Sequence, residues 1–475
     1  MPKPIYITGA AGTGKTTKLL ERTASYAKEL ITAPHHQLLA MAYMHGARRR
    51  LESSLEEDVE CKKIPRMVST IDSFALSLLN RWRTGLGITL PVCVAPEHCR
   101  KRFERHNRLY LPFAEITSYA ADLLLIPSVA RIVAASYPLV AIDEFQDCTG
   151  PKLDLVRAFA DASQLILAAD AFQLLDGNVA GCPAVEWVEG LGNEGLRECH
   201  QLTEPHRFAN HDIFLAARSL RERARQTNGT VPLHICPIRP VAWHIMERVR
   251  LGWYGPRWTG TTALIATGGG QIVDEFLRSL GEYTSKQRCT PIYWSRQAKS
   301  DVELDTLYKR LGVTSSHLDE SDWMRTGQLT GSHVAEVVDR ALRFARLRGL
   351  DKIPKHLVTY LAEQVVHTSR AHGEKSSRFV TTTIHGAKNR EFDNVIVVWT
   401  YQVPPDVEVE RRWLYNAITR AKRNCIVIDT RSKAIVTKDE IVMLLGDPTP
   451  IFPKKTKTIK VQTGAKTRRA GSVKK

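Results

Sequence analysis

Residues 9–16 read Gly-Ala-Ala-Gly-Thr-Gly-Lys-Thr and directly follow the apolar run Ile5–Ile7. They match the phosphate-binding loop G-x-x-x-x-G-K-[ST], and the strand-like run before them and the helical pattern after them are the context that this loop needs. Its glycines let successive backbone N–H groups face phosphate oxygens at the positive end of a helix. The stretch predicts a strand–loop–helix unit that binds a nucleoside triphosphate. The alternative is a glycine turn without a ligand.

The phosphate contacts are predicted to come from the loop and the first helical turn. Lys15 is placed to reach the β- and γ-phosphates, and the hydroxyl of Thr16 is placed to ligate Mg²⁺. The full set predicted to bind the nucleotide here is Gly9, Gly12, Thr13, Gly14, Lys15 and Thr16. The cofactors expected from this loop are ATP and Mg²⁺.

A second acidic segment follows another apolar run. Residues 139–147 read Leu-Val-Ala-Ile-Asp-Glu-Phe-Gln-Asp, so that Asp143 and Glu144 come where a buried parallel strand should end. Asp143 is the expected second anchor for Mg²⁺, and Glu144 suits a base that orients or deprotonates the attacking water. The alternative is a strand that ends in a solvated acidic turn. Together with the phosphate-binding loop, the segment predicts hydrolysis of the nucleotide.

Composition narrows the class of partner. The chain has 475 residues and a formal net charge of +17, and residues 454–475 carry nine lysines and arginines without an acid. Such a balance favours a polyanionic partner, most simply nucleic acid, and the basic tail is expected to be disordered. The alternative for the tail is a solubilising segment without a dedicated partner. The sequence holds no 18-residue apolar run, and the odd number of cysteines, nine, favours a reducing cytoplasm.

Strand-like and helical runs alternate twice along the chain, with a lapse between. Alternation of this kind predicts parallel sheets covered by helices. We therefore expect an α/β fold of two tandem parallel-sheet domains, with the nucleotide in the cleft between them. The predicted bounds are 1–200 for the first domain, with an insertion at about 81–137, and 201–453 for the second, with an insertion at about 284–378.

Taken together, these segments resemble superfamily 1A helicases, the UvrD/Rep-like group, whose two domains are RecA-like. Residues 143–147, DEFQD, are similar to motif II of the group, and Ala169–Gln173 resemble its motif III. The resemblance implies that Gln173 senses the γ-phosphate. It also implies that Arg207, in a segment similar to motif IV, and Arg420, in a segment similar to motif VI, are arginine fingers.

The resemblance also implies DNA contacts. The run 70–79 looks like the segment of the group that contacts single-stranded DNA, which assigns that role to Thr70, Ser73 and Phe74. Residues 383–393 resemble motif V, in which Thr383 and His385 would touch the DNA backbone and Glu391 the ribose.

Departures from the group affect base and DNA binding. Four residues precede the first strand, which leaves no room for the upstream adenine-reading glutamine motif, so adenine selectivity is expected to be loose and to rest on stacking by His206. The aromatic residues that the group has after motif III are missing after Gln173. Base stacking would then come from elsewhere, with Trp187 as a candidate. Asn389 replaces the motif V glycine.

The expected function is that of a single-stranded-DNA-stimulated ATPase that moves 3′→5′ on single strands and unwinds single/double-strand junctions in replication, repair or recombination. One alternative is a translocase or loader that displaces proteins without processive unwinding. Another is an RNA-directed or regulatory P-loop NTPase. We expect a monomer without membrane association, with replication or recombination proteins as possible partners, in the cytoplasm of a bacterial or phage-infected cell.

Overall fold

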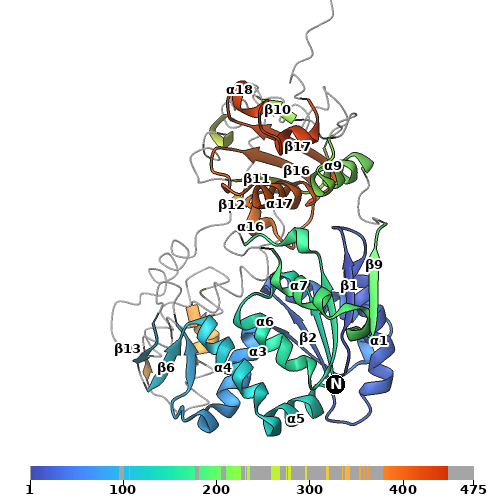
Figure 1. The fold of residues 1–475 in the computed structure, drawn as a ribbon. Helices are drawn as coiled ribbons and strands as arrows, with labels where there is room; N and C mark the ends of the chain where they lie inside the picture. Colours follow the sequence, from blue (N-terminus) through green and yellow to red (C-terminus); the bar gives the residue numbers. More distant parts are fainter. Residues whose placement is uncertain are drawn as a thin grey trace, which may run out of the picture.

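The structure, a computed structural model, forms two α/β units that lie one above the other in Figure 1. It describes residues 2–95, 101–105, 107–176, 181–204, 210–225, 258–267 and 378–447, together with short pieces at 231, 233–235, 274, 276–279, 295–296, 317–319, 334, 337–342, 352–354, 358 and 361–362. The basic tail, most of the predicted second insertion, and His206 and Arg207 lie outside the described residues.

The first unit is built on a six-stranded sheet in the order β3-β2-β7-β8-β1-β9, with all neighbouring strands parallel. Its strands are β1 (Ile5–Gly9), β2 (Leu38–Ala42), β3 (Arg66–Thr70), β7 (Leu139–Asp143), β8 (Gln164–Ala169) and β9 (Glu198–Leu202). Parallel strands need helical crossovers, so both faces of such a sheet are covered, and its central strands are apolar on both sides. The predicted α/β class is confirmed here.

Alternation along the strands divides the core in two. Ile5 and Ile7 pack in a cluster with side chains from α1 (Lys15–Leu30) and α2 (His45–Glu57), whereas Tyr6 packs in the cluster on the other face. Five described helices contribute to that second face: α3 (Ile71–Trp82), α4 (Phe113–Leu125), α5 (Pro127–Ser136), α6 (Pro151–Ala160) and α7 (Pro183–Gly190). The loops that leave the carboxyl ends of the strands therefore meet at one edge.

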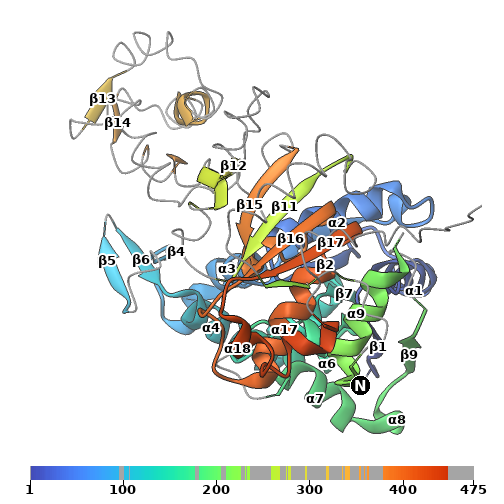
Figure 2. The same cartoon turned by 90° about the horizontal axis from the view of Figure 1, so that it is seen from above.

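The first insertion is smaller than predicted. Within the described part of this insertion, a separate sheet of order β4-β6-β5 is made of β4 (Val92–Val94), β5 (Phe103–Arg105) and β6 (Arg108–Leu111). Seen from above, this sheet stands apart from both large sheets (Figure 2). Residues 113–136 instead form α4 and α5 (Pro127–Ser136), whose apolar side chains pack in the core of the first unit. Their apolar spacing, rather than the basic run before them, decides their place.

The second unit has its own parallel sheet, in the order β10-β17-β16-β11-β15-β12. Its strands are β10 (Leu233–Ile235), β11 (Thr262–Ala266), β12 (Ser295–Arg296), β15 (Phe379–Thr383), β16 (Phe392–Trp399) and β17 (Ala421–Asp429). The helices α9 (His211–Glu222), α16 (Ile384–Ala387) and α17 (Val407–Ile418) pack in one cluster with this sheet. The chain thus passes to the second unit between β9 and α9, slightly later than residue 200.

Among the described residues, no single helix is long and apolar enough to cross a membrane, although the bent pair α4–α5 would qualify by length and composition alone.

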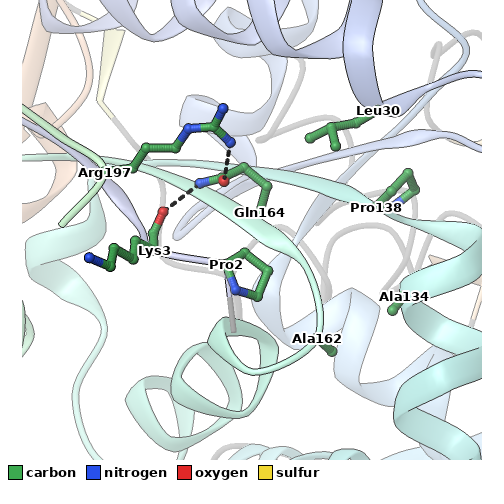
Figure 3. Close-up of a pocket in the computed structure, with 8 residues that line it drawn as sticks. All are labelled: Pro2, Lys3, Leu30, Ala134, Pro138, Ala162, Gln164 and Arg197. Carbon is green, nitrogen blue, oxygen red and sulfur yellow. Dashed lines mark hydrogen bonds between the residues drawn. The ribbon is translucent and has the colours of Figure 1, made fainter. Parts of the chain in front are cut away.

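A pocket of about 480 Å³ opens at the amino-terminal edge of the first sheet, opposite the strand ends that carry the phosphate-binding loop (Figure 3). The side-chain amide of Gln164, which lines this pocket, donates to the backbone oxygens of Lys3 and Leu165 and accepts a hydrogen bond from Arg197. Both ends of this amide therefore already have partners within the protein.

Candidate nucleotide site between the two sheets

The phosphate-binding loop joins β1 to α1 and has the backbone that its glycines allow. Gly12 and Gly14 have positive φ angles of 79° and 84°, and Gly14 is the N-cap of α1. A Cβ on Gly9 would lie 2.6 Å from Oγ1 of Thr13 and 2.8 Å from the backbone oxygen of Leu202. The loop thus needs glycine for backbone angles at two positions and for a close approach at the third.

Lys15 and Thr16 lie at the start of α1, beside the ends of two other strands. The Lys15 ammonium donates to the backbone oxygens of Gly9 at 2.9 Å and Ala10 at 3.0 Å. It also lies 3.9 Å from the Asp170 carboxylate at the end of β8. The Thr16 hydroxyl donates to Asp143 Oδ2 at 3.0 Å. The sheet therefore brings the loop lysine and the two predicted metal ligands to one edge.

The hydroxyl and carboxylate oxygens of Thr16 and Asp143 fit Mg²⁺, which is held in such sites by one or two protein oxygens together with phosphate oxygens. Burial, followed by the neighbouring charge of Glu144, raises the pKa of Asp143 to about 6. A divalent cation would compensate both effects, since it stabilises the ionised carboxylate. The donor set therefore suits a hard divalent cation better than an uncharged ligand.

Glu144 follows Asp143 in a left-handed backbone conformation, with φ of 56°. Gln146 donates to its Oε2 at 2.6 Å, and the oxygen of the same amide accepts from the backbone N–H of Asp170 at 3.0 Å. Burial opposes ionisation of Glu144, but the charges of Lys388, Lys15 and Arg50 and the hydrogen bond from Gln146 lower its pKa to about 2. Glu144 is thus an ionised, oriented carboxylate beside the predicted metal site.

Asp170 connects the loop lysine to the segment that resembles motif III. Its carboxylate is fully buried and accepts from Gln173 Nε2 at 2.9 Å and from Arg221 of α9 at 2.7 Å. In turn, Gln173 Oε1 accepts from Arg420 of the second unit at 3.3 Å. Gln173 and Arg420, two of the residues predicted to act on the γ-phosphate, are therefore in contact with each other across the two units.

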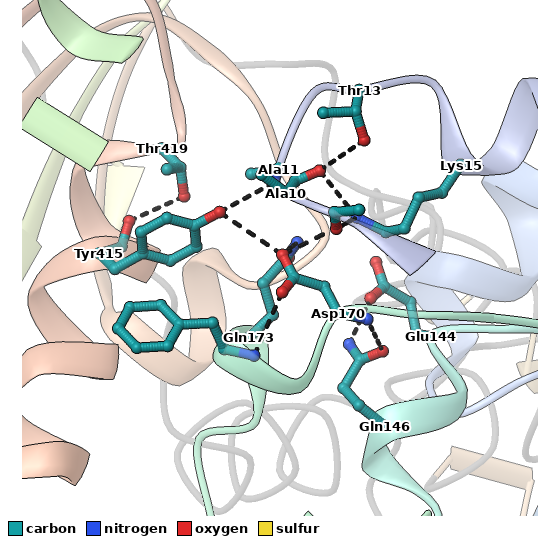
Figure 4. A network of polar contacts seen from close by, with 12 residues as sticks. Ala10, Ala11, Thr13, Lys15, Glu144, Gln146, Asp170, Gln173, Tyr415 and Thr419 are labelled. Atoms are coloured by element: carbon teal, nitrogen blue, oxygen red, sulfur yellow. Dashed lines mark hydrogen bonds and ion pairs between the residues drawn. The ribbon is translucent and has the colours of Figure 1, made fainter. Parts of the chain in front are cut away.

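Tyr415 of α17 reaches directly into the phosphate-binding loop (Figure 4). Its hydroxyl accepts from the backbone N–H of Ala11 at 2.8 Å and lies 3.4 Å from Asp170 Oδ2. Burial, followed by the charge of Asp170, raises the pKa of Tyr415 above its usual value. Because Tyr415 is fully buried, this contact is part of a packed interface between the units.

A buried ion pair adds a third link between the units. Lys388, in the segment that resembles motif V, donates to Asp147 of DEFQD and, at 3.1 Å, to the backbone oxygen of Gln173. Lys388 and Asp147 have side chains that are 6% and 5% exposed. Burial nevertheless raises the pKa of Asp147 to about 6, although Lys388 opposes that shift. Motifs from both halves of the chain thus meet around Gln173.

Other predicted residues lie nearby or outside the described part. Glu391 pairs with Lys422 at 3.1 Å and lies 3.9 Å from Arg50 of the first unit. The predicted ribose contact of Glu391 stays a prediction. His206 and Arg207 belong to the segment that is not described, so the predicted stacking and arginine-finger roles also stay predictions.

The predicted DNA contacts in the first unit need a correction. Phe74 is 4% exposed and packs in the core against Phe159, with ring centroids 5.5 Å apart, so the prediction that its ring contacts DNA is wrong for this structure. Thr70 is also buried and caps α3, where its side chain accepts from the backbone N–H of Ser73 at 3.1 Å. Ser73 is exposed, and its predicted role is not tested.

In the second unit, Thr383 caps α16 by accepting from the backbone N–H of Gly386 at 3.1 Å. His385 packs edge-on against Trp413, with centroids 5.2 Å apart, and burial, followed by the charge of Lys388, lowers its pKa. Their DNA contacts stay predictions. Trp187, the candidate for base stacking, instead packs against Phe145 of the core cluster.

Three contributors from the second unit were not predicted from the sequence: Tyr415, Lys388 and Arg221. Tyr415 and Lys388 lie inside motif-like segments, five residues before Arg420 and three before Glu391, so their position was a usable signal. Arg221 lies in an ordinary amphipathic helix and has no local signal. Its contact with Asp170 depends on how the two units pack.

Comparison with known families matches both halves of this site. A family described as an AAA domain matches residues 1–178, which include the phosphate-binding loop, DEFQD and Gln173. A family described as a UvrD-like helicase C-terminal domain matches residues 379–428, which include Lys388, Tyr415 and Arg420. Together, the two matches support a likeness to the UvrD/Rep-like superfamily 1 helicases.

Other comparisons are more distant. One solved structure, entitled "The structure of PRRSV helicase", is 11% identical, covers 90% of this chain and has a TM-score of 0.34. The match covers 53% of that chain, so the present chain spans about half its length. No curated protein matches the sequence. The two family matches support nucleotide use by a helicase-like protein.

Proposed function

We propose that this protein is a Mg²⁺-dependent ATPase stimulated by single-stranded DNA, which moves 3′→5′ along the strand and unwinds single/double-strand junctions. The observation that carries the proposal is the contact of Tyr415 and Arg420 with Ala11 and Gln173 across the two units. Because these contacts join the two units, the catalytic residues are all in place only when the units lie close together. A ligand that alters the distance between the units would therefore alter the rate of ATP hydrolysis.

The residues divide the chemistry among them. Backbone N–H groups of residues 9–14 and the Lys15 ammonium would bind phosphate oxygens, and Thr16 and Asp143 would hold Mg²⁺. The metal would supply neutralisation of phosphate charge. Glu144, which is ionised, would accept a proton from the attacking water while Gln146 keeps its carboxylate oriented.

Arg420 would supply the positive charge that stabilises the transition state, because it comes from the second unit and reaches Gln173. Arg207 is proposed as a second finger on the basis of its motif alone. We propose that alternating approach and separation of the two sheets is converted into stepping along a strand.

A translocase or loader without processive unwinding is a second candidate. It is favoured by the small size of the first insertion, where the described separate sheet has three strands of three or four residues. A small accessory sheet offers little area to engage a duplex.

We further propose that the protein works as a cytoplasmic monomer in DNA replication, repair or recombination of a bacterial or phage-infected cell. Support for a reducing compartment comes from the cysteines of the described part, Cys61, Cys93, Cys148, Cys182, Cys199 and Cys425, which are free thiols. Replication or recombination proteins are its proposed partners.

The test is ATP turnover measured in parallel without nucleic acid, with single-stranded DNA, with duplex DNA and with RNA. Strong stimulation by single-stranded DNA alone is the expected result, whereas equal stimulation by RNA would contradict the DNA assignment. Polarity and unwinding are measured on the same preparation. Release of streptavidin from a biotinylated 5′ end but not from a 3′ end would support 3′→5′ movement, and a forked duplex distinguishes unwinding from translocation.

A further inference from the structure

Arg50 lies between the two units, next to the carboxylate to which we assign the proton-accepting role. It comes from α2, a helix that contributes no residue to the predicted site. Its guanidinium lies 3.9 Å from Oε1 of Glu144 in the first unit and 3.9 Å from Oε1 of Glu391 in the second. One cation therefore faces a carboxylate from each unit.

The two oxygens of Glu144 have different partners. Gln146, which belongs to the same unit, donates to Oε2 at 2.6 Å, whereas Arg50 faces Oε1. Gln146 thus fixes the carboxylate whatever the second unit does. Arg50 lies within 4 Å of both Glu144 and Glu391, so it is the cation through which the position of Glu391 can affect Glu144.

The guanidinium of Arg50 is held by charge rather than by close hydrogen bonds. Its Nε is buried without a hydrogen-bond partner among the described residues, and both ion pairs are at 3.9 Å rather than at hydrogen-bonding distance. Charge-assisted hydrogen bonds are shorter and stronger than contacts at this distance. Small movements of the second unit therefore have room to strengthen or weaken the hold of Arg50 on Glu144.

Without Arg50, the carboxylates of Glu144 and Glu391 would both lose the cation that lies 3.9 Å from each of them. Glu391 would keep Lys422, at 3.1 Å, as a partner. Glu144 would keep Gln146 but would lose the nearby cation on Oε1. Removal of Arg50 is thus expected to disturb Glu144 more than Glu391, and the disturbance should be larger when the two units lie close together.

We propose that Arg50 is a positioning residue that couples approach of the second unit, through Glu391, to the orientation of Glu144. This inference rests on the proposed ATPase function. The competing explanation is a solvent-exposed ion pair without consequence, since the Arg50 side chain is 41% exposed and most pairs of that kind contribute little.

The experiment compares steady-state ATP hydrolysis, with and without single-stranded DNA, in the full-length protein and in Arg50→Ala and Arg50→Lys. The matched control is Arg48→Ala, on the same helix, whose guanidinium pairs with Glu52 at 3.0 Å and so lies on another face. We expect Arg50→Ala to lower the DNA-stimulated kcat about 10-fold or more with little change in KM, a loss below that of a removed general base. Arg50→Lys should recover much of the rate, and Arg48→Ala should match the parent.

A second comparison tests the coupling. In a Glu391→Gln background, Arg50→Ala should cost clearly less in stimulated kcat than in the parent, because the link to the second unit is already broken. An equal cost in both backgrounds would overturn the coupling. Parent-like kcat in Arg50→Ala, an effect on KM alone, or equal loss in Arg50→Lys would overturn the positioning role. Absence of turnover in the parent would instead contradict the proposed ATPase function.

Discussion

Four neighbouring polar residues of DEFQD do four different things because their surroundings differ. Asp143 faces the Thr16 hydroxyl, Glu144 is held by Gln146 among cations, and Asp147 is paired with Lys388. Burial raises the pKa of Asp143 and Asp147 to about 6, whereas nearby positive charge lowers that of Glu144 to about 2. Divergent pKa values within one acidic cluster are typical of sites in which one group must stay ionised.

Replacing Lys15 by alanine tests the phosphate-binding loop at this scale. Lys15→Ala removes the ammonium that we place against phosphate charge, so turnover should fall to background while the fold remains intact. The matched control is Lys18→Ala, one turn further along α1, whose ammonium pairs with Glu21 at 2.8 Å. ATPase rates and circular dichroism of both variants provide the measurement. Normal turnover in Lys15→Ala would rule out the assignment of the loop.

Residue positions could be predicted from sequence where the requirement is local. The spacing of the glycines and Lys15, and of Asp143 and Glu144 after a strand, follows from backbone geometry within a few residues, and the structure brings them together. The prediction that Phe74 contacts DNA was wrong because a sequence motif gives the residue type but not the face of the helix on which the residue lies. The contact between Arg221 and Asp170 joins residues 51 positions apart, which no local pattern encodes.

At the scale of elements, the junction of β1 with the loop depends on a missing side chain. A Cβ on Gly9 would lie 2.8 Å from the backbone oxygen of Leu202 in β9, which cannot move without disturbing the sheet. Gly9→Ala should therefore destabilise the protein by about 1–3 kcal/mol. Gly46→Ala is the matched control, since nothing lies within 4 Å of its added Cβ and helix α2 should gain up to about 1 kcal/mol. Urea unfolding of both variants measures the difference, and equal stability would contradict the close approach.

A largely buried acid in α17, Glu410, predicts the pH dependence of the second unit. Burial, followed by the charge of Asp439, raises the pKa of Glu410 to about 7, although Arg431 opposes that shift. The folded state therefore binds a proton that the unfolded state has released, and stability should fall as pH rises from about 4.5 to 7 by at most about 1.4 kcal/mol per pH unit. Glu410→Gln should remove this dependence and raise the melting temperature at pH 8.

The control for that comparison is Glu440→Gln, an exposed glutamate next to Asp439. Scanning calorimetry from pH 5 to 8 gives both curves. If Glu410→Gln and the parent lose stability in parallel over this range, then Glu410 is not the group that titrates.

Elements were predictable from sequence where their pattern is strongly periodic. The strands near the nucleotide site fall close to the apolar runs that predict them, because a buried parallel strand needs a continuous apolar segment. The predicted insertion was too long because its bounds followed the basic, aromatic run of residues 100–110, whereas the apolar spacing of α4 places that helix in the core. Ile116, Ala120 and Leu123 of that helix lie in the core of the first unit.

At the scale of the whole molecule, the Tyr415 hydroxyl of the second unit accepts a hydrogen bond from the backbone N–H of Ala11 in the first unit. Tyr415→Phe keeps the ring, which packs 4.9 Å from Phe172, but leaves the buried N–H of Ala11 without its acceptor. We expect a loss of about 1–3 kcal/mol in unfolding free energy and a lower ATPase rate. Tyr401→Phe, at a side chain that is 63% exposed, is the control. Equal denaturation midpoints for the two variants would show that the contact contributes nothing.

Much of the positive net charge of the whole chain lies in its basic tail. Residues 454–475 carry nine cationic side chains and no acid, so contacts of this segment with DNA should be to phosphates and independent of base sequence. Deleting the segment should weaken DNA binding most at low salt and flatten the slope of log K against log salt. ATPase at saturating single-stranded DNA should stay near that of the full chain, because Lys15, Glu144 and Arg420 all precede residue 454. An unchanged salt slope would show that the segment does not touch DNA, whereas loss of maximal ATPase would make it part of the motor.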